Sequence, residues 1–266
     1  MRVLVWVLSW LLPVCAIAAA PVPAVTPSMA ATAQQLLRQA AQGSPGYDIV
    51  ESLTTEVGPR LAGSAAEARA RQWAVQKLVA LGLRNVRVEN FEVPVWQRGA
   101  ERAEIVAPFP QPLVVTALGG SAATGPDGVE AEVVAFASVA ALQAAPQDSV
   151  QGKIVFIDEP MARSRDGSGY GVAVTKRLVT AYVAQQLGAV GALIRSVGTG
   201  DHRFPHTGQM RPAGGSGPDG VPAAALAQPD ADQLQRALSR GQPVIVRLVI
   251  TPQRLPRRNP EMSLPR

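Results

Sequence analysis

The sequence contains a single cysteine, Cys15, among 266 residues, and that cysteine lies in the leading segment. Once the leader is removed, the chain can form no disulfide and has no thiol nucleophile. Histidine is almost as scarce, because only His202 and His206 are present. Charged residues make up only 17% of the chain, whereas hydrophobic residues make up 47%. This balance is sufficient to bury a core and excludes wholesale disorder.

The first residues have the layout of a secretory signal peptide. Arg2 precedes an apolar run from Val3 to Val14, and small residues follow from Ala16 to Ala20. The run is too short for a transmembrane helix. We therefore predict cleavage after Ala18 and a secreted or periplasmic protein without a stable membrane span. Lipid attachment at Cys15 is the alternative, although the large Val14 before it does not suit that signal.

The basic residues do not form a nucleic-acid-binding pattern. The whole chain has 25 basic and 20 acidic residues, a net charge of +5. Setting aside Arg2, the four arginines of the last sixteen residues and Glu261 leaves 20 basic and 19 acidic residues. A nucleic-acid-binding domain would carry a basic face or stripe. We therefore predict no nucleic-acid partner.

Periodicity predicts alternating helices and strands. Ser64 and Glu67 have the spacing of a helix N-cap, and apolar residues then recur every three or four positions as far as Leu81. Gly82 and Gly188 are expected to end helices. Further helices are predicted over 30–41, 47–53, 172–187 and 230–238, and strands over 86–89, 129–136, 153–158, 189–194, 223–226 and 243–250. Helices between short buried strands indicate an α/β fold.

Four motifs, in this order, resemble those of secreted zinc exopeptidases of the aminopeptidase and carboxypeptidase Q type. The first is Val57-Gly-Pro-Arg-Leu-Ala-Gly-Ser64, and the second is Trp96-Gln-Arg-Gly99. Gly152-Lys-Ile-Val155 and Gly188-Ala-Val-Gly-Ala192 are similar to the protease-associated (PA) domain inserted in many of these enzymes. A motif needs its context, and here the context is the order of several motifs along most of the chain.

The resemblance implies a split architecture with an α/β fold throughout. Residues 1–18 would be the signal peptide and 19–29 a linker. Residues 30–115 would be the opening, incomplete portion of the peptidase domain. Residues 116–250 would be the PA insert, and 251–266, which are rich in proline and arginine, an unstructured basic tail.

The resemblance also implies two zinc ions in the full-length enzyme, held by His, Asp and Glu, with a Glu as general base and a peptide as substrate. The family's ligand set needs a His-x-Asp element, but the residues two positions after His202 and His206 are Phe204 and Gly208. We therefore assign no catalytic residue and no metal ligand in this chain, and expect it to bind no zinc. The resemblance leaves Arg195, His206 and Thr207 as candidate contacts with substrate or with the remaining catalytic domain.

Other polar residues have simpler interpretations. Pro205 lies between the two histidines, so a helical metal-binding pair is excluded. Ser64 has no neighbouring base in a supporting motif and is interpreted as a cap rather than a nucleophile. The segment 163–170 lacks the Gly-Lys-Ser/Thr ending of a phosphate-binding loop and is predicted to be a surface loop.

Three functional hypotheses remain at this stage. The first is the N-terminal part of a secreted zinc metallopeptidase that is inactive alone, so whether this chain is itself an enzyme is left undecided. The second is a stand-alone secreted binding module for peptides or a protein partner. The third is a frameshift product, suggested by the change of composition after Ile250. The sequence does not specify the oligomeric state or the peptide terminus that the full enzyme would cleave.

Overall fold

The computed structural model describes residues 25–211 and 220–258, which divide into two units at residue 56. The signal peptide predicted over residues 1–18 lies outside the described residues. The first unit contains α1 (Pro27–Ala41) and α2 (Gly46–Ser52), followed by a π-helical turn over Leu53–Val57. The hydroxyl of Thr26 caps α1 by accepting a hydrogen bond from the amide of Met29 at 3.2 Å. The helix therefore begins inside the segment predicted to be a linker.

The second unit begins with α3 (Ala65–Ala80), whose start agrees with the predicted cap. The Ser64 hydroxyl accepts a hydrogen bond from the Glu67 amide at 3.2 Å, and Gly82 follows the helix with a φ of +79°. The capping interpretation of Ser64 is confirmed. The apolar residues that recur along α3 form no buried face, because none of its residues is buried in the described structure.

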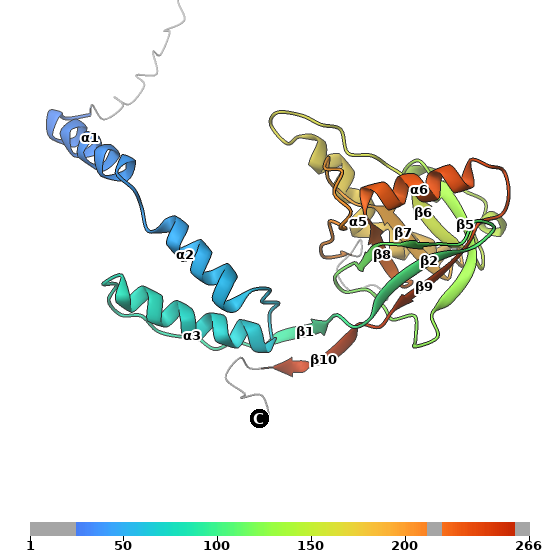
Figure 1. The fold of residues 1–266 in the computed structure, drawn as a ribbon, viewed down its shortest axis with the longest axis horizontal. Coiled ribbons are helices and arrows are strands. Elements are labelled where there is room, and N and C mark those ends of the chain that lie inside the picture. Colours follow the sequence, from blue (N-terminus) through green and yellow to red (C-terminus); the bar gives the residue numbers. More distant parts are fainter. Residues whose placement is uncertain (1–24, 212–219, 259–266) are drawn as a thin grey trace, which may run out of the picture. The chain divides into compact units, whose positions relative to one another are not determined.

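The rest of the second unit is a mixed α/β domain, in agreement with the predicted fold class. Its strands are β1 (Val93–Gln97), β2 (Glu101–Ala107), β3 (Gln111–Leu113), β4 (Val115–Ala117), β5 (Val129–Phe136), β6 (Ile154–Ile157), β7 (Gly191–Arg195), β8 (Ala223–Leu226), β9 (Ile245–Ile250) and β10 (Gln253–Arg258). Its helices after α3 are α4 (Val139–Gln143), α5 (Gly169–Gln186) and α6 (Gln228–Leu238), with a 3₁₀ turn over Gln147–Ser149 (Figure 1).

Eight of these strands form one sheet in the order β3-β2-β9-β5-β6-β7-β8-β4. Strands β5 to β8 are parallel neighbours, whereas the other pairs are antiparallel. The two edge strands, β3 and β4, are separated only by Val114, so one short segment pairs with β2 and then with β8. The sheet is thereby closed into a barrel-like structure without long free edges. It also includes β2, which precedes residue 116, where the sequence analysis places the start of the insert.

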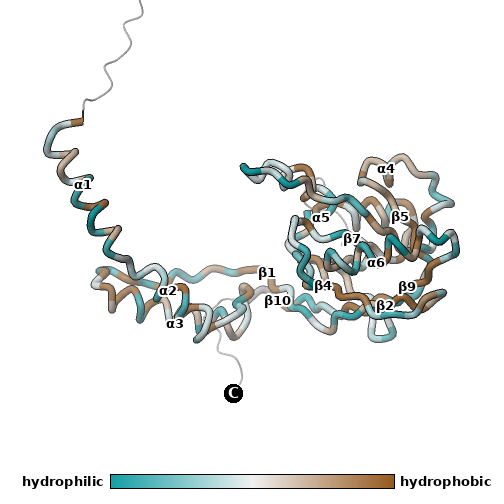
Figure 2. Tube along the Cα trace, turned by 45° about the horizontal axis from the view of Figure 1, so that its top comes forward, coloured by the Kyte–Doolittle hydropathy of each residue, from teal (hydrophilic) through white to brown (hydrophobic). Residues whose placement is uncertain are grey.

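Strands β6, β7 and β8 are buried along their whole length, because helices cover both faces of this part of the sheet. Ile154 and Phe156 of β6 pack in the cluster that includes Ala231 and Leu234 of α6. Val155 and Ile157, which point to the opposite face, pack in the cluster that includes residues of α4 and α5. Figure 2 shows the resulting concentration of hydrophobic residues along the strands. Gly188 has a φ of +78° and lies just after α5, as predicted.

Two predictions of local structure were wrong. Residues 86–89 form no strand, and β1 begins instead at Val93. Part of the segment predicted to be an unstructured tail forms β10, which pairs antiparallel with β1 and places Leu255 opposite Val95. A two-stranded ribbon leaves one side of each strand unpaired, so it tolerates the proline and arginines that had suggested disorder.

Candidate functional site at the carboxyl ends of the parallel strands

Three polar positions meet where the parallel strands end. Asp158 follows β6, Arg195 is the last residue of β7, and Gln228 begins α6 directly after β8. Because parallel strands end at the same edge of a sheet, this edge gathers side chains from distant parts of the sequence. This edge of the sheet is therefore the candidate functional site.

Arg195 connects the three positions. Its Nε donates a hydrogen bond to Asp158 Oδ1 at 2.6 Å, and its Nη1 donates to Asp232 Oδ1 at 2.7 Å and to Gln228 Oε1 at 3.0 Å. Burial lowers the pKa of Arg195, but the hydrogen bonds and charges of the two carboxylates outweigh burial and raise the pKa above its usual value. Arg195 is 8% exposed, and its Nε and Nη1 are both engaged, so the side chain stabilises the strand ends.

The neighbouring cation, Lys176 of α5, is completely buried. Its Nζ donates a hydrogen bond to the backbone oxygen of Glu159 at 2.6 Å. Burial lowers the pKa of Lys176 to about 8, although the carboxylates of Glu159 and Asp158 act in the opposite direction. The ammonium joins α5 to the segment that follows β6.

The loop after β7 holds the other two candidate residues. The amide of His206 donates to the hydroxyl of Ser196 at 2.8 Å, and the hydroxyl of Thr207 donates to the Ala117 oxygen at 2.8 Å. Thr207 therefore fastens the loop to the end of β4. The His206 ring is exposed and meets Tyr170 edge-on, with ring centroids 6.5 Å apart. Of the three residues predicted as contacts, His206 alone is exposed.

The two histidines do not converge on a metal-binding geometry. The ring of His202 stacks on Phe204, with centroids 5.3 Å apart, and both residues are exposed. Within residues 25–211 and 220–258, no group of three or more His, Cys, Asp or Glu side chains is placed to hold a metal ion. The hydroxyl of Ser196 is also engaged, because it donates to the Leu226 oxygen at 2.6 Å.

The sequence did not reveal the buried carboxylate of Asp230. Asp230, 2% exposed, accepts a hydrogen bond from the amide of Val114 at 3.0 Å and is paired with Arg203 at 2.9 Å. It thus joins the first turn of α6 to the link between β3 and β4. The available signal was an acidic residue in the first turn of a helix, but that signal does not identify the distant amide that the carboxylate binds.

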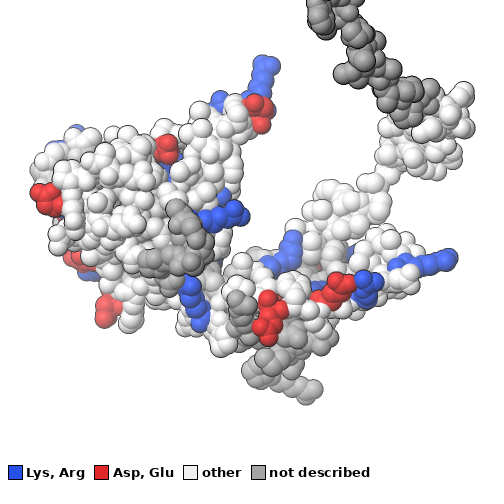
Figure 3. Space-filling model, turned by 180° about the vertical axis from the view of Figure 1, so that it is seen from behind, with Lys and Arg blue, Asp and Glu red and all other residues white. Residues whose placement is uncertain are grey.

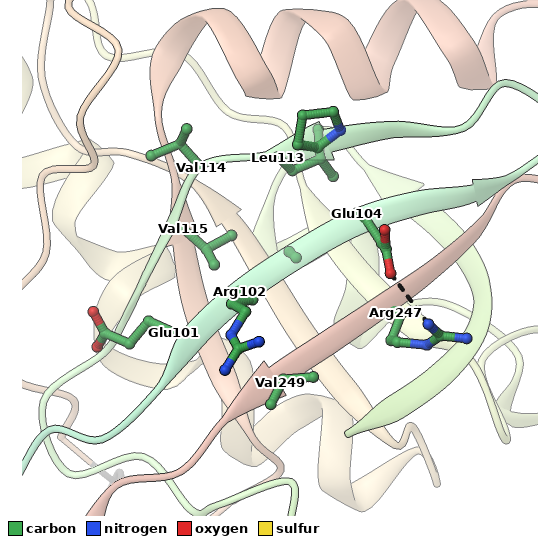
Figure 4. A pocket seen from close by; sticks show the side chains of 10 residues that line it. Glu101, Arg102, Glu104, Leu113, Val114, Val115, Arg247 and Val249 are labelled. Atoms are coloured by element: carbon green, nitrogen blue, oxygen red, sulfur yellow. Dashed lines mark hydrogen bonds and ion pairs between the residues drawn. The ribbon is translucent and has the colours of Figure 1, made fainter. Parts of the chain in front are cut away.

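Two of the hollows on the surface of this unit are lined by charged side chains. One, of about 430 Å³, lies between the loops at 160–163 and 198–201 and the start of α6. The other, of about 630 Å³, lies over the outward side of β2, where Arg102 is drawn between Val115 and Val249 (Figure 4). Arg247 beside it pairs with Glu104 at 3.2 Å and with Glu130 at 2.7 Å. Neither hollow brings a nucleophile and a base together.

On the face of the molecule in Figure 3, basic and acidic side chains are interspersed. This distribution differs from the contiguous basic stripe expected of a nucleic-acid-binding surface. In the part of the chain that the structure describes, no helix is both long enough and apolar enough to cross a membrane.

Comparison with known proteins shows which family this chain resembles. The PA domain family matches residues 111–234. Carboxypeptidase Q from Bos taurus is 35% identical over 202 residues, which are 76% of this chain and 41% of that protein. Carboxypeptidase Q from Homo sapiens is 33% identical over 202 residues, which are again 76% of this chain and 41% of that protein. The chain thus spans about two-fifths of these curated relatives.

Solved structures agree. The crystal structure of a peptidase M28 precursor from Shewanella amazonensis matches with a TM-score of 0.81 and 47% identity, covering 86% of this chain and 51% of that chain. A zinc aminopeptidase from Bacillus subtilis shares the fold, with a TM-score of 0.53 at 20% identity. The chain is therefore a peptidase-family protein with a PA domain. Within that class it is homologous to carboxypeptidase Q and to the M28 peptidases over the part that aligns.

Proposed function

We propose that this chain supplies the N-terminal part of a secreted, zinc-dependent exopeptidase and does not hydrolyse peptides by itself. The peptidase family supports the reaction class, and the 47% identity to the Shewanella peptidase supports it most directly. The apolar run at 3–14, followed by small residues, supports export with cleavage after Ala18.

The observation that carries the second half of the proposal is the placement of the two histidines. Zinc sites in proteins are built from imidazole, thiolate and carboxylate groups at close range. His202 stacks on Phe204, His206 contacts Tyr170, and no ligand cluster forms around either among the described residues. The residues described here do not fit a zinc pair, so we propose no catalytic role for them.

In this proposal the PA domain shapes access to a peptide-binding site, and its contribution is binding rather than chemistry. The exposed His206 and the loop after β7 lie at the edge where ligands of α/β domains bind. A second candidate function, a stand-alone module that binds peptides, is favoured by the barrel, which closes on itself without further polypeptide.

A hydrolysis assay distinguishes these functions from an active enzyme. The purified mature chain is incubated with zinc and with dipeptides that have free termini, a blocked N-terminus or a blocked C-terminus. We expect no hydrolysis, with cooperative thermal unfolding as the control that the chain is folded. Turnover of either blocked substrate would refute the proposed inactivity and would also show which terminus is recognised. Peptide binding without turnover would favour the binding module.

A further inference from the structure

Arg177, in the middle of α5, is a buried cation with an incomplete set of partners. Its side chain is 9% exposed, and its Nη2 donates one hydrogen bond, to the hydroxyl of Tyr170 at 2.6 Å. The guanidinium carbon lies 5.6 Å from the centroid of the Tyr170 ring. Its Nε is buried and has no hydrogen-bond partner. Within the described ranges 25–211 and 220–258, no carboxylate forms an ion pair with Arg177.

This arrangement is costly for the folded protein. A guanidinium carries a permanent charge and five N–H donors, and its burial is unfavourable unless the charge is paired and the donors are engaged. The other buried arginine of this domain, Arg195, meets that requirement with Asp158, Asp232 and Gln228. Arg177 uses one donor among the described residues. The described residues therefore leave the charge of Arg177 available to an anionic partner.

The surroundings of Arg177 would favour an anion. The backbone at Gly208 lies against the guanidinium so closely that a Cβ there would be 2.7 Å from Cζ. His206, two residues earlier, is exposed and contacts Tyr170. The amide of Arg211 donates to the oxygen of Leu178, the residue after Arg177, which brings a second arginine to this part of α5.

We propose that Arg177, Tyr170 and His206 form a binding site for a carboxylate group. A carboxylate is planar and has two oxygens, so it matches the fork of N–H donors on a guanidinium. Arg177 supplies the charge, Tyr170 holds the guanidinium in place through its hydroxyl, and Gly208 leaves room for its face. The carboxylate belongs to a small acid or to a peptide, as its C-terminus or as an acidic side chain.

The test is a binding titration followed by NMR, with sodium acetate against sodium chloride at equal ionic strength. Acetylated tripeptides then separate the sources: one with a free C-terminus, one amidated, and one amidated with an internal Glu. We expect acetate and at least one of the two acidic peptides to bind, and the neutral amide not to bind. Arg177→Met should weaken binding at least tenfold, and Tyr170→Phe severalfold. Arg240→Met, which changes an exposed arginine of the same unit, should leave binding unchanged.

Stability without ligand separates this role from a structural one. If Arg177 serves only the fold, Arg177→Met lowers Tm or prevents folding, and the proposal fails. If Arg177 awaits a carboxylate, Arg177→Met keeps or raises Tm, because an apolar side chain replaces an unpaired charge. No acetate or peptide binding by the unaltered chain, or equal binding by Arg177→Met, would also overturn the proposal. Binding is measured here without zinc or turnover, so its failure leaves the proposed peptidase function untested and intact.

Discussion

Arg195 and Asp158 are joined by a hydrogen bond of 2.6 Å between Nε and Oδ1, which connects the end of β7 to the residue after β6. Asp232 of α6 shares the same guanidinium at 2.7 Å. One arginine therefore forms ion pairs with two acidic groups from different elements. Arg195, which is a predicted contact for substrate or for the remaining catalytic domain, thus also stabilises the ends of the parallel strands.

Replacing Arg195 by methionine should destabilise the domain by about 3 kcal/mol, because it leaves the mostly buried Asp158 without its partner. The matched control is Arg247→Met, since Arg247 makes its two ion pairs at the surface and should cost less than about 1 kcal/mol. Urea unfolding followed by circular dichroism measures both. Equal losses for the two variants would contradict the assigned role of Arg195.

Asp230→Ala should cost about 2 kcal/mol, because the amide of Val114 loses the acceptor that it has in the buried carboxylate. The exposed Asp127 provides a matched control, and Asp127→Ala should change stability by less than about 0.5 kcal/mol. Hydrogen exchange locates the effect, which should appear first at Val114. If the Val114 amide exchanges no faster in Asp230→Ala than in the original chain, the link between α6 and the β3–β4 segment is contradicted.

Lys176 gives the folded state a distinctive pH dependence. Its pKa is about 8 when folded and 10.5 as the unperturbed value, so between these pH values the unfolded chain retains a proton that the folded chain has released. The penalty of the buried charge is therefore full below pH 8 and disappears as the pH rises towards 10.5. We expect the stability of the original chain, relative to Lys176→Met, to rise by up to about 1.4 kcal/mol per pH unit in this window. Chemical unfolding at pH 7, 8.5 and 9.5 measures it, and a flat difference would refute the shifted pKa.

Strand β10 should protect β1 from solvent exchange, because β10 is the only described partner of β1 in their two-stranded sheet. Ending the chain after Thr251 should therefore increase amide exchange at Val95 and Trp96. Exchange at Ile154 to Ile157, in the centre of the larger sheet, should stay slow and serves as the internal control. Unchanged protection of β1 would mean that the β1–β10 pairing does not form in solution.

The sequence predicted the elements whose signals are local. The Ser64 cap, the glycines at 82 and 188, and the helices of the PA region follow from spacing and turn chemistry. The prediction of a strand at 86–89 was wrong. Alternating Val and charged residues favour a strand only where a neighbouring strand pairs with them, and no strand pairs with this segment in the described structure. The segment after Ile250 failed for the opposite reason, since pairing with β1 overrides its unfavourable composition.

The site was less predictable, because it depends on contacts across the fold. His206 and Thr207 lie close to the ends of β7 and β4, but the role of Thr207 depends on the Ala117 oxygen, 90 positions away. Asp158 ends the strand predicted over 153–158, and only the position of Arg195 on the neighbouring strand shows its partner. Arg177 belongs to no sequence motif, because what singles it out is an incomplete set of partners among the described residues.

The central proposal is that this chain, although homologous to carboxypeptidase Q and the M28 peptidases, holds no hydrolytic metal centre. The most direct test is the zinc content of the purified mature chain after equilibration with zinc and removal of loosely bound metal. The account predicts far less than one zinc ion per folded chain, because neither His202 nor His206 has a supporting ligand cluster among the described residues. One or two tightly bound zinc ions per chain, accompanied by peptide hydrolysis, would contradict it and would assign a metal-binding role to residues that are interpreted here as structural.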